Sequence, residues 1–178
     1  MLDKILGECT TEWMKAKSLK KHPFRYCSLA TVGSNSTPES RMVVLRHFEP
    51  STFLFTIYSD QRSSKITALE NNPLGVLLFY DSKKMVQVRV KARCVLITED
   101  SEAYAQQHEK AQKDYTTSRP PGTKIKSMDE IRYTTKNHFV KLIFRAEEIE
   151  YLRLKRPNHH RAIFEILDGK WEGHFLVP

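Results

Sequence analysis

Hydrophobic residues near the N-terminus recur at steps of three and four positions, whereas most later apolar residues alternate with polar ones. The first pattern predicts an amphipathic helix over residues 2–19, because side chains at these steps share one helix face. The second pattern predicts strands, since neighbouring side chains of a strand point to opposite faces. We expect strands at residues 25–32, 41–48, 51–59, 74–81, 84–100, 138–154, 161–167 and 170–177.

The segments between these strands predict three further helices and one long loop. A short helix is expected to begin at Ser63 or Ser64 and to end before the sequence Asn-Asn-Pro. A second helix is expected over residues 101–115, and a weaker one over residues 128–136. Two prolines and a glycine in succession predict that residues 115–127 form an irregular loop, and a loop of that length is often functional.

The connections between the predicted strands are mostly short, and Asp168-Gly169 is a strong signal for a two-residue hairpin. We therefore expect about seven or eight mostly antiparallel strands, and closure into a barrel would remove the edges that such a sheet exposes. The prediction is a mainly β fold, a closed or split antiparallel barrel with short helices. We expect one domain over residues 1–178, with a helical segment at residues 1–22.

Composition narrows the classes of protein only slightly. Lys and Arg outnumber Asp and Glu by 29 to 21, but no run of five or six basic residues occurs, so most of them are expected to be solvated. Cys9, Cys27 and Cys94 lie far apart, which favours neither a disulfide framework nor a zinc site, and we expect no metal. Without an apolar leader or membrane-length segment, we expect a cytoplasmic protein with no membrane partner.

The loop of residues 58–65, "YSDQRSSK", carries the clearest chemistry. Its serine hydroxyls, its basic side chains and the N-terminus of the following helix are the ingredients of a phosphate site. The alternative is an ordinary capped helix with solvated basic residues. Arg41 favours the phosphate site: if its strand pairs with the next one, Arg41 lies near Tyr58, Ser59 and Lys65.

Five segments in a fixed order resemble the pyridoxamine 5′-phosphate oxidase-like family of FMN-binding split barrels. They are "RMVVLRHF", "FTIYSDQRSSKITALENNP", "LLFYD", "QVRVKA" and "RAIFEILDGKWEGHFLVP". The resemblance covers the chain from about residue 24 to the end, and it is greatest to a branch of oxidase-related proteins whose substrates are undefined. It implies a homodimer that binds FMN between its subunits.

The resemblance also implies roles for individual residues. Arg41 and Lys65 would hold the FMN phosphate, Arg46 would reach the flavin ring, and Arg161 would approach the ring from the second subunit. His159 matches a histidine on the substrate side, where the loop residues Ser118 and Arg119 are also expected from their position alone. The implied cofactor residues are Arg41, Met42, Val43, Val44, Leu45, Arg46, Tyr58, Ser59, Ser63, Ser64, Lys65, Gln87 and Arg161.

The chain departs from the family at several substrate-side positions. Gln106 and Lys110 align with a tyrosine and an arginine that grip the substrate phosphate, Pro157 replaces an arginine, and Leu152 replaces a tryptophan beside the flavin. We therefore predict an FMN-dependent oxidoreductase for an undefined small substrate and assign no catalytic residue.

Two other functions remain open. The same cofactor residues would serve a non-enzymatic flavin carrier or redox sensor. Nucleic-acid binding is the less favoured alternative, because the basic strand "KKMVQVRVKAR" lacks the aromatic residues on which bases stack.

Overall fold

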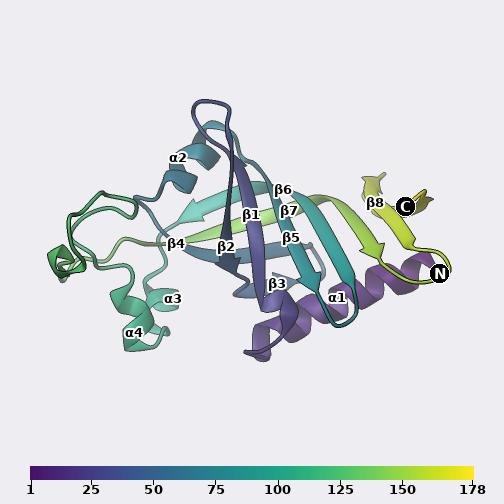
Figure 1. Ribbon diagram of the computed structural model, residues 1–178, viewed down its shortest axis with the longest axis horizontal. Coiled ribbons are helices and arrows are strands. Elements are labelled where there is room, and N and C mark those ends of the chain that lie inside the picture. Colours follow the sequence, from purple (N-terminus) through teal and green to yellow (C-terminus); the bar gives the residue numbers. More distant parts are fainter.

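The computed structural model describes all 178 residues and contains far more strand than helix. In Figure 1 the strands curl around a central core, the helix α1 runs beneath them, and the two termini lie together at the right. In chain order the elements are α1 (Leu2–Ser18), η1 (Pro23–Arg25), β1 (Tyr26–Val32), β2 (Pro38–Val44), β3 (His47–Glu49), β4 (Leu54–Asp60), α2 (Ser64–Asn71), β5 (Leu74–Asp81), β6 (Val86–Thr98), α3 (Ser101–Ala105), α4 (Glu109–Lys113), η2 (Met128–Glu130), β7 (Phe139–Arg153), β8 (His160–Leu167) and β9 (Lys170–Leu176).

Every paired strand runs antiparallel to its neighbour, as predicted. The strand order is β2-β1-β5-β6-β7-β4-β3, with β8 joined to β7 and β9 joined to β8. One edge of the long strand β7 pairs first with β4 and then with β8, while β6 follows its other edge. The sheet therefore branches along β7, and this branching confirms the expected mainly β, split architecture.

The short link between β2 and β3 brings the two ends of the sheet together. The Leu45 amide donates to the Arg25 carbonyl at 2.8 Å, and the Arg46 amide donates to the Thr56 carbonyl at 2.9 Å. The predicted strand 41–48 is therefore wrong as one strand, because the chain leaves one sheet edge at this point and joins the other. Arg41 is paired with Leu29 of β1, and it does not lie on a strand that pairs with β4.

Helix α1 closes one end of the barrel with the apolar face that its periodicity predicts. Its Trp13 is fully buried, with ring centroids 5.1 Å from Phe48, 5.0 Å from Phe55 and 5.8 Å from Phe79. The buried residues on this face of the helix are Ile5, Cys9, Trp13 and Ala16. These aromatic side chains pack against one another at the centre of the barrel, which favours a ligand site at its margins.

Two of the predicted helices are shorter than expected, whereas the predicted hairpin is confirmed. The segment 101–115 forms α3 and α4 separately, because the Asp100 side chain caps one helix and the His108 side chain caps the other. The segment 128–136 forms only the single turn η2. Asp168 and Gly169 have φ angles of 50° and 76°, as a tight hairpin between β8 and β9 requires.

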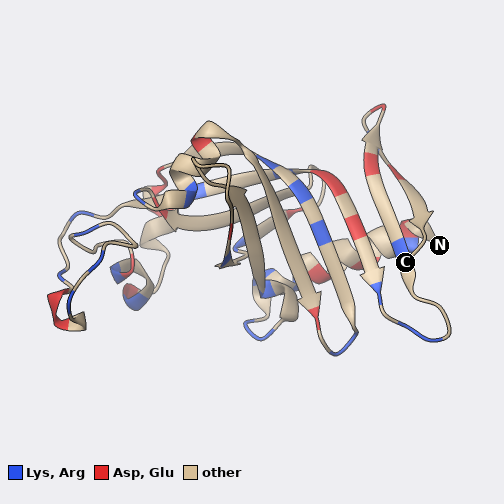
Figure 2. Cartoon of the chain, turned by 45° about the horizontal axis from the view of Figure 1, so that its top comes forward, with Lys and Arg blue, Asp and Glu red and all other residues tan.

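All three basic side chains of β6 pair with acidic side chains of β7, and Figure 2 shows the adjacent blue and red positions. These cross-strand ion pairs neutralise part of the excess positive charge. The pairs are Arg89 with Glu150, Lys91 with Glu148 at 2.7 Å and Arg93 with Glu147 at 2.7 Å. None of the helices has the length and apolar character needed to cross a bilayer.

Candidate functional site

A cavity of about 310 Å³ lies at the end of the barrel where α2 begins and the segment after α4 passes by. Its walls come from β2, from the end of β4, from the loop before α2 and from this segment. Most of the residues expected to bind the cofactor therefore meet in one place. The lining residues are Arg41, Met42, Val43, Val44, Arg46, Tyr58, Ser59, Asp60, Ser63, Lys65, Asp114, Tyr115 and Pro121.

Lys65 and two serines form one side of the cavity. The Lys65 ammonium donates to Ser59 Oγ and to Ser63 Oγ, each at 3.0 Å, and the two hydroxyls lie 3.1 Å apart. Ser63 is the N-cap residue of α2, yet its side chain does not cap the helix. Since the free N–H groups of a helix start attract anions, this side of the cavity suits a phosphate group.

Arg41 adds a second positive charge beside Lys65. Its guanidinium donates to Thr31 Oγ1 at 2.7 Å and to Glu39 Oε2 at 2.8 Å. Burial, and then the charge of Arg41, hold the pKa of Lys65 below its usual range. A bound dianion would remove the repulsion between the two cations, so the arrangement fits a phosphate monoester.

Arg46 lies farther along the cavity and has an unused hydrogen-bond donor. Its Nε atom is buried without a partner, and its guanidinium carbon lies 5.3 Å from the centroid of the Tyr58 ring. A buried donor without a partner costs free energy, and a polar ligand atom would remove that cost. Together with the cationic side of the cavity, this donor fits a ligand that carries a phosphate on one end and polar ring atoms on the other.

Four lining residues, Asp60, Asp114, Tyr115 and Pro121, were not among the residues expected to bind the cofactor. Tyr115 packs on Phe139 at 5.0 Å between ring centroids; burial raises its pKa, whereas the Arg46 charge opposes that rise. The available signal was its place at the start of the loop 115–127, which was already expected to be functional.

Four other expected residues lie nearby but do not line the cavity. Leu45 is fully buried in the barrel core, and Ser64 is exposed on the first turn of α2. Ser118 and Arg119 belong to the loop after the cavity, where Arg119 pairs with Glu130 at 3.3 Å.

The remaining expected residues lie at the other end of the sheet. Gln87 of β6 and Arg161 of β8 both pair with Leu152 of β7, whereas Tyr58 pairs with Lys141 of the same strand. Leu152 lies eleven residues beyond Lys141, a path of roughly 35 Å along an extended strand. His159 directly precedes β8 and is two residues before Arg161, so it lies at the same end of the sheet as Arg161. One chain therefore does not bring these residues to the cavity.

Arg161 is held where it lies by a buried carboxylate. Glu150, which is 6 % exposed, accepts from the Arg161 guanidinium at 2.9 Å and also pairs with Arg89. The Arg161 side chain stays partly exposed at 34 %, so part of the guanidinium is available to a neighbouring molecule.

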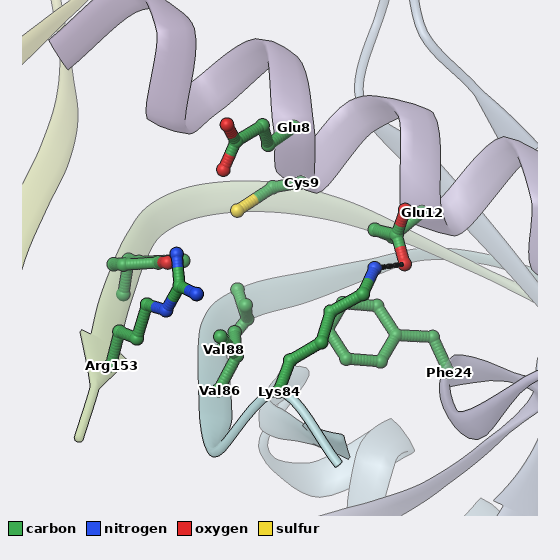
Figure 3. A pocket seen from close by; sticks show the side chains of 9 residues that line it. Glu8, Cys9, Glu12, Phe24, Lys84, Val86, Val88 and Arg153 are labelled. Carbon is green, nitrogen blue, oxygen red and sulfur yellow. Dashed lines mark hydrogen bonds and ion pairs between the residues drawn. The ribbon is translucent and has the colours of Figure 1, made fainter. Parts of the chain in front are cut away.

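A second cavity, of about 300 Å³, lies between α1 and the sheet strands β6 and β7 (Figure 3). The Cys9 thiol points into it, but burial raises the pKa of this thiol to about 12, which makes it a poor nucleophile. Glu8 and Glu12 line the same cavity, and Glu12 is already paired with Lys84 at 2.6 Å. In the second cavity these two carboxylates match the two cations, Lys84 and Arg153. The first cavity has three cations against Asp60 and Asp114, so its excess positive charge makes it the candidate functional site.

The fold and the first cavity together define a class of protein: a split antiparallel barrel with a site for a phosphate-bearing cofactor at its margin. A comparison with protein families supports this class independently. Residues 10–98 match the family described as pyridoxamine 5′-phosphate oxidase, FMN-binding domain. The chain belongs to this family, and its cofactor is FMN.

Individual relatives agree with this assignment. A Caenorhabditis elegans protein named "Putative pyridoxamine 5'-phosphate oxidase" is 31% identical over 85% of this chain. The match spans only 60% of that longer protein. The pyridoxine/pyridoxamine 5′-phosphate oxidase of Zymomonas mobilis is 29% identical over 94% of this chain and 95% of its own. The structure of a pyridoxamine 5′-phosphate oxidase-related, FMN binding protein from Nostoc punctiforme superposes with a TM-score of 0.78 over 96% of both chains at 19% identity.

Proposed function

We propose that this protein is an oxidoreductase that uses FMN to oxidise or reduce a small substrate. The observation that carries the proposal is the first cavity, in which the Lys65 ammonium and two hydroxyls face Arg41 while Arg46 keeps a free donor. Lys65, Ser59 and Ser63 would hold the phosphate of FMN, and Arg46 would reach the polar atoms of its ring. FMN supplies the hydride chemistry when bound; the protein binds the cofactor, orients it and provides its electrostatic surroundings.

The proposal includes a homodimer, because one chain supplies only part of the site. Gln87 and Arg161 lie at the opposite end of the sheet from the cavity, as the positions of β8 and α2 in Figure 1 indicate. A two-fold axis would bring these residues of one subunit to the cavity of the other. In this arrangement Glu150 would hold Arg161 toward the partner's flavin.

Two further parts of the proposal rest on simpler observations. Cys9, Cys27 and Cys94 are all free thiols, which supports a reducing compartment such as the cytoplasm. One connected sheet includes strands from residue 26 to residue 176, which supports a single domain over residues 1–178.

For the substrate we propose a phosphorylated amine or alcohol of the pyridoxamine 5′-phosphate type, after the names of the relatives. Gln106 and Lys110, which the sequence aligned with the phosphate-gripping pair of the family, are exposed and do not line the cavity. Tyr115 does line it, and Arg119 follows four residues later. We assign the substrate phosphate to Tyr115, because Arg119 is exposed, pairs with Glu130 and does not line the cavity.

The test is turnover of pyridoxamine 5′-phosphate by the FMN-loaded protein in air, measured as formation of pyridoxal 5′-phosphate. The proposal predicts turnover, with a KM for Tyr115→Phe roughly tenfold higher, the effect of one lost hydrogen bond to a charged group. Tyr26→Phe, at a 54 % exposed tyrosine that does not line the cavity, is the matched control and should not change KM. A protein that binds FMN but turns over neither this substrate nor the corresponding alcohol would instead be a flavin carrier or redox sensor.

A further inference from the structure

Arg62 makes an unusually complete set of side-chain hydrogen bonds beside the candidate site. Its Nε donates to Asp60 Oδ1 at 3.0 Å, and its Nη2 donates to Asp60 Oδ2 at 2.7 Å. Its Nη1 donates to the Thr117 carbonyl at 2.9 Å, and its Nη2 also reaches Thr117 Oγ1 at 3.1 Å. The Arg62 and Asp60 side chains are only 18 % and 6 % exposed, so this is a structural link and not a solvated surface pair.

The link joins two segments that are 55 residues apart in the sequence. On one side, Asp60 ends β4 and its carbonyl accepts from Ser63 Oγ at 2.8 Å, so the link is continuous with the serine and lysine side of the cavity. On the other side, Thr117 lies two residues after Tyr115, at the base of the loop that carries Pro121.

The base of this loop is otherwise held mainly by backbone hydrogen bonds. The Ser118 amide donates to the Arg132 carbonyl, the Thr134 amide to the Thr116 carbonyl and the His138 amide to the Tyr115 carbonyl, each at 2.8 Å. The His138 bond and the packing of Tyr115 on Phe139 place the first side of the loop beside the start of β7. Arg62 supplies the side-chain hydrogen bonds that join this side of the loop to the phosphate-binding loop.

We infer that Arg62 is a positioning residue that couples the phosphate-binding loop to the substrate-side loop and thereby holds Tyr115 in the cavity. This inference rests on the proposed function for its ligand. A phosphate that binds Ser63 and Lys65 steadies the loop from residue 59 to residue 65, and the Arg62 link passes this ordering to residues 116–118. When two segments are linked in this way, a ligand that orders one of them shifts the other toward its ordered state.

The test is hydrogen exchange at the backbone amides of Ser118, Thr134 and His138, measured with and without saturating FMN. In the unmodified protein we expect FMN to slow exchange at these amides. In Arg62→Lys we expect FMN still to bind, since the Lys65 and serine contacts remain, but the protection at these amides should be lost. Without FMN, the same variant should exchange about tenfold faster there, as expected when charge-assisted bonds are removed.

Lys124→Met is the matched control, because Lys124 is an exposed cation of the same loop without a side-chain hydrogen bond to its base. It should exchange like the unmodified protein. Arg62→Lys keeps a positive charge beside Asp60, and the double variant Asp60→Asn/Arg62→Met removes both charges together, so neither leaves a lone buried carboxylate. At least one of them should fold and show the faster exchange.

The outcomes separate the two proposals. If FMN binds and Arg62→Lys keeps the protection of the unmodified protein, the coupling is refuted while the proposed function stands. If the unmodified protein does not bind FMN, the proposed function fails, and the exchange rates without FMN still decide whether Arg62 anchors the loop. Exchange unchanged by both variants would refute the role of Arg62 in either case.

Discussion

Lys65→Met tests the phosphate assignment most sharply, because Lys65 has only hydroxyl partners whereas Arg41 also contacts Glu39. Hydrogen bonds to charged groups contribute about 1.5 to 3 kcal/mol. The variant should therefore bind FMN roughly 10- to 150-fold more weakly. Riboflavin lacks the phosphate, so its dissociation constant should change by less than about threefold.

The assay is flavin fluorescence during titration of the apoprotein with FMN and with riboflavin. Lys84→Met is the matched control, since Lys84 pairs with Glu12 beside the second cavity and should leave both affinities unchanged. Affinity for FMN should also fall at alkaline pH, because only the protonated amine binds a phosphate. The pKa of Lys65 is lowered by burial and by Arg41, so this fall should begin below the pH at which an ordinary lysine titrates. Equal losses for FMN and riboflavin would refute the placement of the phosphate.

The remaining predictions concern the flavin potential and the thiols. Arg161→Ala should lower the reduction potential of bound FMN, because a cation near the ring stabilises the anionic reduced flavin. Glu150→Gln should raise this potential, because it removes the negative charge that offsets Arg161. A redox-dye titration measures both, and an unchanged potential would show that Arg161 does not act at the flavin. Burial raises the pKa of Cys9 and Cys27 to about 12. Both thiols should therefore resist a thiol reagent at pH 8 until the protein is unfolded. Rapid labelling of the native protein would contradict their burial.

Local patterns in the sequence predicted the features that neighbouring residues determine. The three- and four-residue periodicity located α1 with Trp13 on its buried face, and Asp168-Gly169 marked the last hairpin. The loop of residues 58–65 stood out as a candidate phosphate site because hydroxyls, cations and a helix start lie within eight residues. These features need no information about distant strands.

Features that depend on tertiary contacts could not be predicted in the same way. Arg41 reaches the cavity although its strand pairs with β1, because the turn at residues 45–46 folds one sheet edge toward the other. Tyr115 lines the cavity because the segment after two short helices bonds to His138, directly before β7, and no local pattern encodes that contact. The resemblance supplied Gln87 and Arg161, but their distance from the cavity depends on register along β7.

The most direct test of the central claim is the visible absorption spectrum of the freshly purified protein, followed by acid release and mass identification of its chromophore. We expect a yellow protein that releases FMN at about one molecule per chain, and the Lys65→Met variant should lose most of it. A colourless protein that takes up no added FMN at micromolar concentration would refute FMN binding at the cavity beside Lys65.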